Sequence, residues 1–315
     1  MKRWEKMILV INLNASVDKR YELQDIKKGA VMRAKTVENT PGGKGIHVAN
    51  VATILKEDCL VTGFLGGKIG EFIKDKLKCY NIKNDFVDIK EDTRECLAFT
   101  TDDLIQTEIL EPGPNVTEDE RESFFNKYNS LIDKSTIVVA SGSVPRNIED
   151  SFYKELIKIA NAKGKKFLLD TSGELLKKGI EEKPYFIKPN KDEIESFTGR
   201  SIKSDEDVIS EIRRFQEIGI KLVVISLGAE GSIAGYDGKF YKTTFQKVNA
   251  VNTVGSGDSY VAGVAIALNR GYDIKKLLKL ASACGTANSL EKETGFVKEE
   301  IVLDLMNKVN VEEIG

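Results

Sequence analysis

Short, continuous apolar runs are the feature of this sequence that most constrains its fold. They do not alternate with single polar residues, and this pattern is typical of strands buried on both faces of a parallel sheet. Segments with helical periodicity separate them, at Glu118–Leu131, Ser151–Ala162 and Asp205–Gly219. The repeated order of strand, helix and strand predicts an α/β fold, an open and mostly parallel sheet flanked by helices. The apolar runs are Met7–Ile11, Cys59–Leu65, Ile137–Ala140, Phe167–Leu169 and Leu222–Leu227.

Two stretches, residues 14–40 and 93–112, interrupt this alternation. Both are polar and favour strands, with turn signals at Lys28-Gly29 and Asp102-Asp103. Their strand-like pieces alternate in character, so one face of each could contact water. We therefore expect a single domain over residues 1–315, with these stretches forming a small β-sheet lid over the strand ends. The pieces are Arg33–Glu38, Glu95–Thr100 and Thr107–Leu110.

Composition excludes several classes of protein. The formal net charge of the 315 residues is −2, which predicts no general attraction to nucleic acid or to an anionic membrane. The run Met7–Ile11, which follows a basic hexamer, is too short to span a membrane. The four cysteines lie far apart without a C-x-x-C pair, which favours reduced thiols in a cytoplasmic protein. The single histidine, His47, excludes His-rich metal centres.

The segment Gly255-Ser256-Gly257-Asp258 predicts an anion site at the start of a helix. Two glycines free the backbone to direct several N–H groups at one ligand, next to the positive end of a helix dipole. An aspartate in the first helical turn would then lie beside the anion and could accept a proton from an attacking hydroxyl. The alternative is an ordinary helix start capped by an aspartate, and the segment alone does not decide between the two.

A second glycine-rich stretch surrounds Lys44. Gly42 and Gly43 precede the lysine, Gly45 follows it, and a helix rich in small residues comes next. Such a stretch allows the backbone to approach a ligand closely, with a cation alongside. It is not a Walker A loop, because no Ser or Thr follows the lysine, and the chain also lacks the G-x-G-x-x-G fingerprint. A tight turn into a closely packed helix is the alternative.

Together, the stretches Pro41–Asn50 and Asn252–Gly263 resemble the two signatures of the PfkB (ribokinase-like) family of carbohydrate kinases. Shorter motifs between and around them extend the resemblance over nearly the whole chain, in the family's order. These motifs are Asn14-Ala-Ser-Val-Asp18, Thr93-Arg94, Ser141-Gly-Ser-Val-Pro145, Lys188-Pro-Asn190 with Glu193, and Ser226-Leu-Gly228.

The resemblance implies a role for each matching residue. Asp258 would be the catalytic base, with Gly255, Ser256 and Gly257 around the transferred phosphoryl group. The acceptor sugar would be held by Asp18, Gly42, Gly43, Lys44, His47, Arg94 and Ser141. ATP would contact Lys188, Asn190, Ser226, Gly228 and Gly257, and Glu193 would help to place Mg²⁺ through water. From the residues alone, Glu193 could equally belong to a capping box.

The form Gly-Gly-Lys-Gly, with Asp-Thr-Arg and Lys-Pro-Asn, is most similar to the branch that phosphorylates sugars already carrying a phosphate. This implies conversion of fructose 1-phosphate to fructose 1,6-bisphosphate, with tagatose 6-phosphate and fructose 6-phosphate as alternative acceptors. Lys44 and Arg94 suit this interpretation, because a phosphorylated acceptor needs cations and arginine can grip phosphate with two hydrogen bonds. Members of the family often pair through their lids, which implies a homodimer.

His47 departs from the family pattern, which usually reads Gly-Ile-Asn where this chain has Gly45-Ile46-His47. Histidine is bulkier than asparagine and can titrate near neutral pH. One interpretation is that His47 contacts the acceptor and shifts its preference among sugars. The other is a neutral histidine that makes a bond equivalent to that of the asparagine.

Three competing functions remain at this point. A kinase for nucleosides or simple sugars would not need two cations at the acceptor. A sugar or nucleotide sensor without catalysis is of a different class, and the presence of Asp258 with both flanking glycines argues against it. A dehydrogenase is disfavoured by the missing dinucleotide fingerprint.

Overall fold

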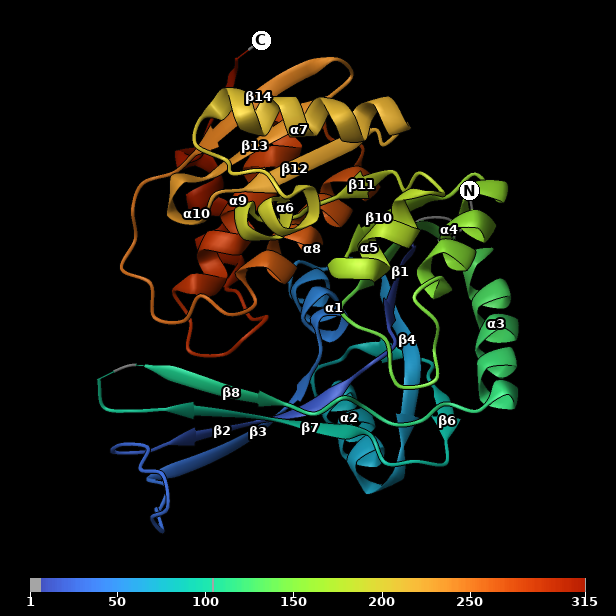
Figure 1. Ribbon diagram of the computed structural model, residues 1–315, viewed down its shortest axis with the longest axis vertical. Helices are drawn as coiled ribbons and strands as arrows, with labels where there is room; N and C mark the ends of the chain where they lie inside the picture. The colour runs from blue at the N-terminus through green and yellow to red at the C-terminus, as the bar shows by residue number, and fades with distance from the viewer. Residues whose placement is uncertain (1–6, 104, 315) are drawn as a thin grey trace.

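A large mixed sheet forms the centre of the molecule in the computed structural model, which describes residues 7–103 and 105–314 (Figure 1). The strand order is β15-β14-β13-β12-β11-β10-β9-β1-β4-β5, and β6 also pairs with β4. Neighbours from β12 to β5 are parallel, whereas β13, β14 and β15 extend one edge in antiparallel fashion. The strands are β1 (Met7–Asn12), β4 (Cys59–Gly66), β5 (Lys83–Asn84), β6 (Val87–Ile89), β9 (Ser135–Ser141), β10 (Lys166–Asp170), β11 (Phe186–Ile187), β12 (Leu222–Ser226), β13 (Ser232–Tyr236), β14 (Lys239–Thr244) and β15 (Asn310–Glu313).

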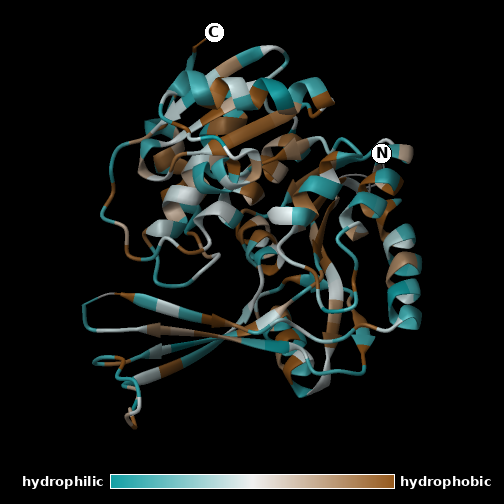
Figure 2. Ribbon diagram, in the orientation of Figure 1, coloured by the Kyte–Doolittle hydropathy of each residue, from teal (hydrophilic) through white to brown (hydrophobic). Residues whose placement is uncertain are grey.

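Helices bury both faces of this sheet, which explains the continuous apolar runs. In β1, Ile8 and Val10 belong to an apolar cluster with α1, α2, α8, α9 and α10, while Leu9 and Ile11 join α3 to α7 on the other face. Figure 2 shows the hydrophobic colour concentrated in the central strands and the hydrophilic colour on the outer helices. The helices are α1 (Lys44–Ile54), α2 (Gly67–Cys79), α3 (Glu118–Ile132), α4 (Phe152–Ala162), α5 (Gly173–Ile180), α6 (Lys191–Thr198), α7 (Asp205–Ile218), α8 (Ser256–Arg270), α9 (Ile274–Ser289) and α10 (Glu299–Lys308).

A second sheet, in the order β3-β2-β7-β8, projects from the body (Figure 1). We call it the lid; its strands are β2 (Ser16–Glu22), β3 (Thr36–Gly42), β7 (Arg94–Thr100) and β8 (Gln106–Leu110). Strands β2 and β7 are parallel, and each also pairs with an antiparallel neighbour. Several apolar side chains of the lid are exposed, among them Val37 (51%), Ile109 (54%) and Leu110 (63%). The lid therefore has much less of a core than the body.

The predicted fold class, an open and mostly parallel sheet with a small additional sheet, is confirmed. The strand expected at Arg33–Glu38 lies further along, at Thr36–Gly42, and β2 and the antiparallel edge were not predicted. The basic residues 1–6 lie outside the described residues, as do Leu104 within the predicted lid and Gly315. None of the described helices is both long and apolar enough to cross a membrane.

Candidate active site

A cavity of about 670 Å³ opens between the lid and the carboxyl ends of the central strands. Asn12, Asp170 and Ser226 line it at the ends of β1, β10 and β12, while Asp18 and Arg94 come from the lid. Strand β1 lies between β4 and β9, so later strands of the chain are added to the sheet on both sides of it. Open α/β sheets bind ligands at such a point, outside the carboxyl ends of the strands.

Most of the predicted site residues line this one cavity, although they come from distant parts of the chain. Asp18, Gly43, Lys44, His47, Arg94, Lys188, Asn190, Glu193, Ser226, Gly255, Gly257 and Asp258 are brought together there. Four others, Gly42, Ser141, Ser256 and Gly228, do not belong to the lining. Ser143, two residues beyond Ser141, lines the wall instead.

Helix α8 directs its N-terminus at the cavity, as predicted from the glycine-rich segment. Gly255 caps the helix with a φ of 81°, and a Cβ there would lie 2.7 Å from Thr294 and 2.8 Å from the backbone nitrogen of Gly295. Glycine is therefore required at this position. Asp258 lies in the first turn and is 6% exposed. It is not the helix cap, which is Gly255, and its Oδ2 is instead 2.8 Å from Nδ1 of His47.

The glycines around Lys44 serve close packing as well as the cavity. A Cβ on Gly42 would come within 2.1 Å of the carboxyl group of Asp18, and one on Gly43 (φ 108°) within 2.6 Å of Nδ2 of Asn12. The N–H of Gly45 donates to Oδ1 of Asn12 at 3.0 Å. The glycine-rich stretch thus holds the first turn of α1 against β1 and the lid, where Lys44 reaches the cavity.

A buried carboxylate, Asp170, organises the cations of the site. Its Oδ2 lies 3.4 Å from Nζ of Lys44 and accepts a hydrogen bond from Ser141 at 2.9 Å, while its Oδ1 lies 3.6 Å from Nζ of Lys188. Burial would raise the pKa of Asp170, but Lys188, Lys44 and Ser141 outweigh burial and hold this pKa below its usual range. Asp170 in turn raises the pKa of Lys44. Lys44 therefore stays charged, while Nζ of Lys188 lies near the N-terminus of α8, where it would be 3.3 Å from a Cβ on Gly257.

Asn190 and Glu193 form a capping box at the start of α6. The N–H of Glu193 donates to Oδ1 of Asn190 at 2.8 Å, and Oε2 of Glu193 accepts from the N–H of Asn190 at 2.8 Å. In the part of the chain that the structure describes, Oε1 of Glu193 has no hydrogen-bond partner, and carboxylate oxygen suits Mg²⁺. The described residues hold no cluster of three or more metal-ligating side chains. Phosphate oxygens and waters would thus have to supply the remaining ligands.

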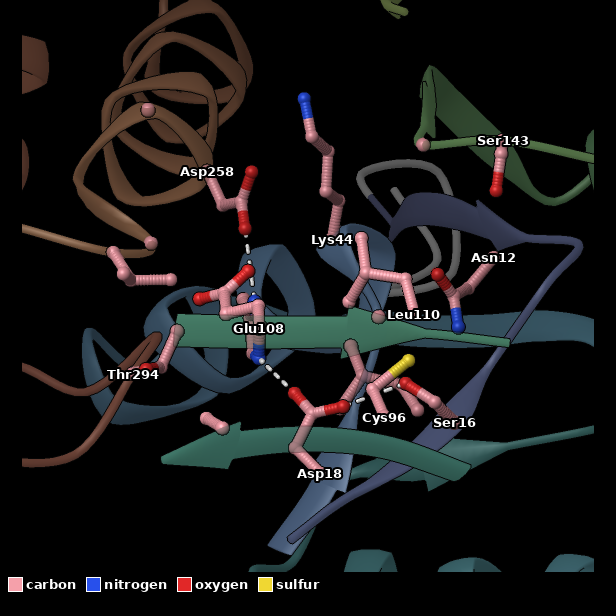
Figure 3. Close-up of a pocket in the computed structure, with 18 of the residues that line it drawn as sticks. Asn12, Ser16, Asp18, Lys44, Cys96, Glu108, Leu110, Ser143, Asp258 and Thr294 are labelled. Atoms are coloured by element: carbon pink, nitrogen blue, oxygen red, sulfur yellow. Dashed lines mark hydrogen bonds and ion pairs between the residues drawn. The ribbon is translucent and has the colours of Figure 1, made fainter. Parts of the chain in front are cut away.

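The lid supplies one wall of the cavity, which includes Ser16, Asp18 and Cys96 (Figure 3). Asp18 accepts a hydrogen bond from Ser16 at 2.7 Å. Burial raises the pKa of Asp18, although His47, Ser16 and Arg94 counteract it. The guanidinium group of Arg94 donates to the carbonyl oxygens of Glu111 and Asn14 at 2.7 and 3.0 Å, which ties the lid to the loops beside it.

The sequence reasoning missed two polar residues at strand ends. Asp170 terminates the predicted strand Phe167–Leu169, and Asn12 terminates the first strand, where it is 2% exposed. Both directly follow a buried apolar run, and this position is the signal that could have identified them.

A buried carboxylate, two lysine side chains and a helix N-terminus around one cavity are features typical of a phosphotransferase, in which charges surround a transferred group. The sequence of residues 7–301 matches the model of the pfkB family of carbohydrate kinases. The chain belongs to this family.

Solved structures extend the likeness to the whole fold. A protein of Staphylococcus aureus provisionally named a phosphofructokinase is 33% identical, with a TM-score of 0.84 over 98% of this chain and 99% of that one. Phosphofructokinase-2 of Escherichia coli, in complex with potassium, is 25% identical, with a TM-score of 0.90 over 95% and 98% of the two chains. A Thermotoga maritima protein provisionally named a 1-phosphofructokinase shares the fold at 24% identity, with a TM-score of 0.89 over 98% and 100%.

Proposed function

We propose that this carbohydrate kinase transfers the γ-phosphoryl group of ATP to a hydroxyl of a phosphorylated ketohexose, and that the acceptor is fructose 1-phosphate. The observation that carries the proposal is the buried carboxylate of Asp258 at the N-terminus of α8, in one cavity with Lys44 and Lys188. A base, a set of oriented N–H groups and two cations are the parts that phosphoryl transfer requires.

In this reaction Asp258 accepts the proton of the attacking hydroxyl. The hydroxyl oxygen forms a bond to the γ-phosphorus, the bond from this phosphorus to the β–γ bridging oxygen breaks, and ADP leaves. The N–H groups from Gly255 to Gly257 stabilise negative charge on the transferred group. Lys44 and Lys188, which Asp170 holds in place, contribute positive charge on the same side.

ATP would extend from this point toward Asn190 and Ser226, which line the cavity, and toward Gly228 just outside its lining. Mg²⁺ would neutralise the β- and γ-phosphates when bound, and Oε1 of Glu193 would hold one of its waters. The capping box supports this role for Glu193, because the bond to Oε2 fixes the carboxylate while Oε1 faces no partner among the described residues.

The acceptor would lie between Asp18 and the strand ends, under the lid. Asp18 would accept hydrogen bonds from sugar hydroxyls, and Arg94 and Lys44 would face the phosphate of the acceptor. The name of the Staphylococcus aureus relative supports a phosphorylated fructose. Tagatose 6-phosphate and fructose 6-phosphate are the alternatives.

ADP release tests the proposal directly. With Mg·ATP, fructose 1-phosphate should exceed tagatose 6-phosphate, fructose 6-phosphate and the unphosphorylated sugars by about 10²-fold in kcat/KM. Dominance of another phosphorylated ketohexose would correct the acceptor and leave the reaction in place. Activity with unphosphorylated sugars alone would contradict the roles of Lys44 and Arg94. ATP binding without turnover on any acceptor would instead favour a sensor.

We also propose that the chain acts in the cytoplasm as a homodimer joined through the lid. The exposed apolar side chains of Val37 and Ile109 support this arrangement, because they lie on the face of the lid away from the cavity and pairing of two lids would remove them from water.

A further inference from the structure

The only histidine of the sequence lies between two carboxylates that the proposed reaction uses. Nδ1 of His47, on α1, is 2.8 Å from Oδ2 of Asp258 on α8. Nε2 of the same ring is 3.8 Å from Oδ2 of Asp18 on β2 of the lid. Figure 3 shows Asp258 and Asp18 on opposite sides of the cavity. This imidazole ring thus lies between a carboxylate of the body and a carboxylate of the lid.

The surroundings of His47 fix this ring in place. The residue is 8% exposed, and a Cβ on Gly295 would lie 2.5 Å from its own Cβ. Nδ2 of Asn50, one turn further along α1, donates to the carbonyl oxygen of Gly295 at 2.9 Å and so holds this loop against the helix. A ring confined in this way has little freedom to turn toward a different partner.

The charges around His47 favour its cationic form. Burial by itself would lower the pKa of His47, but the hydrogen bond and the charge of Asp258 together with the charge of Asp18 raise it above the usual value. Lys44, on the same helix, acts in the opposite direction and is outweighed. A neutral ring that donates from Nδ1 would present the lone pair of Nε2 to the carboxylate of Asp18. A protonated ring offers a donor to both carboxylates.

We propose that His47 is a positioning residue: it holds Oδ2 of Asp258 so that Oδ1 receives the proton of the acceptor hydroxyl, and it couples this carboxylate to Asp18, which holds the same acceptor. The inference rests on the proposed function and goes beyond contact with the sugar. Protonated His47 would also have a second role, because an imidazolium between Asp18 and Asp258 offsets their negative charge where a phosphorylated acceptor must enter.

Nuclear magnetic resonance of the full-length chain labelled with ¹⁵N-histidine tests the linkage without any substrate. Because the chain has one histidine, a single pair of ring nitrogens reports on it. We expect Nδ1 to remain protonated and the ring to titrate above the ordinary value of about 6.5. Asp258→Asn should shift this titration downward most, and Asp18→Asn by less. A native ring that titrates at or below the ordinary value, or that does not respond to Asp258→Asn, would overturn the proposal.

Kinetics of His47→Asn then separate positioning from folding. We expect kcat to fall about 10-fold to 100-fold, with a smaller change in KM for the acceptor and a melting temperature close to native. In the native enzyme, kcat/KM should fall as pH rises through the pKa of His47, because the cation is lost, and this fall should be missing from His47→Asn. Thr53→Ser, on the same helix and outside the cavity lining, is the matched control.

The titration and the kinetics together distinguish failure of this inference from failure of the proposed function. If no acceptor is phosphorylated, the proposed function fails, while the titration of His47 still decides whether the carboxylates are linked. If the kinase is active and His47→Asn keeps both the native kcat and the native pH profile, the positioning role is wrong.

Discussion

The body and the lid are both built largely from strands, yet they differ in what their side chains do. In the body, β1 buries Ile8 to Ile11 on both faces and only its end residue reaches the cavity. In the lid, charged and polar side chains of β2 face the cavity while apolar side chains such as Val37 face water. The difference fits the proposed roles of the two regions: the well-packed body would carry out phosphoryl transfer, and the poorly packed lid would bind the acceptor.

The largest effect is expected in the body, from Asp170→Asn. This change leaves Lys44 and Lys188 without their shared carboxylate, and breaking a buried ion pair costs about 3–5 kcal/mol. The free energy of unfolding, measured in urea, should fall by about this amount. Asp133→Asn is the matched control, because its ion pair with Lys163 is partly exposed and should contribute less than about 1 kcal/mol. Equal effects of the two variants would contradict the central role of Asp170.

The pH dependence of stability sharpens the same point. The pKa of Asp170 lies below its usual range in the folded chain, so its ionised form stabilises the fold above the unfolded value of about 3.9. This contribution is lost as pH falls from there toward the lower pKa of the folded state. Between these two pH values, the free energy of unfolding measured in urea should fall by less in Asp170→Asn than in the native protein.

Asp258→Asn should retain ATP binding and lose at least about 10²-fold in kcat, which equals about 2.7 kcal/mol in activation free energy. The asparagine can still accept the hydrogen bond from His47 but cannot take the proton of the acceptor. Calorimetry with ATP and steady-state assays measure the two properties separately. Near-normal turnover would remove Asp258 from the role of base.

For the lid, Arg94→Lys should raise KM for the phosphorylated acceptor about 10-fold, with a smaller effect on an unphosphorylated sugar. Lysine keeps the charge but loses the planar fork that grips phosphate. Arg33→Lys, in an exposed lid loop outside the cavity lining, is the control. The same change in KM for both kinds of acceptor would place the phosphate elsewhere.

The smallest effect on folding is expected from Val37→Lys, since exposed substitutions change stability by no more than about 0.5 kcal/mol. Its effect on assembly should be large if lids pair. Sedimentation should give twice the mass of one chain for the native protein and a single chain for the variant. Leu303→Lys, at an exposed apolar position of α10 in the body, should leave the mass unchanged. A dimer in both variants would rule out pairing around Val37.

The same comparison explains how much the sequence could predict. Strands of the body were predictable because burial on both faces leaves a run such as Leu222–Leu227 almost without polar residues. Strand β2 carries Asp18, Lys19 and Arg20 in succession, so its pattern resembles a loop until its pairing with β3 and β7 is seen.

At the site, the helix start at Gly255–Asp258 was predictable from local residues, whereas contacts between distant segments were not. The sequence predicted His47 near the acceptor but not its bond to Asp258, because the two residues are 211 positions apart in the chain. The link between Asp170 and the two lysines depends likewise on the approach of the end of β10 to the end of β11, next to Lys188, and to the start of α1 at Lys44, which only the tertiary structure reveals.

Gly43 has a mechanical consequence. Strand β3 ends at Gly42 and α1 begins at Lys44, so this one residue, with a φ of 108°, joins the lid to the helix that carries His47. Any rotation of the lid relative to α1 would change the separation of Asp18 on the lid and His47 on this helix of the body. Binding of the sugar by Asp18 and the orientation of Asp258 by His47 would then both depend on the angle between the lid and α1.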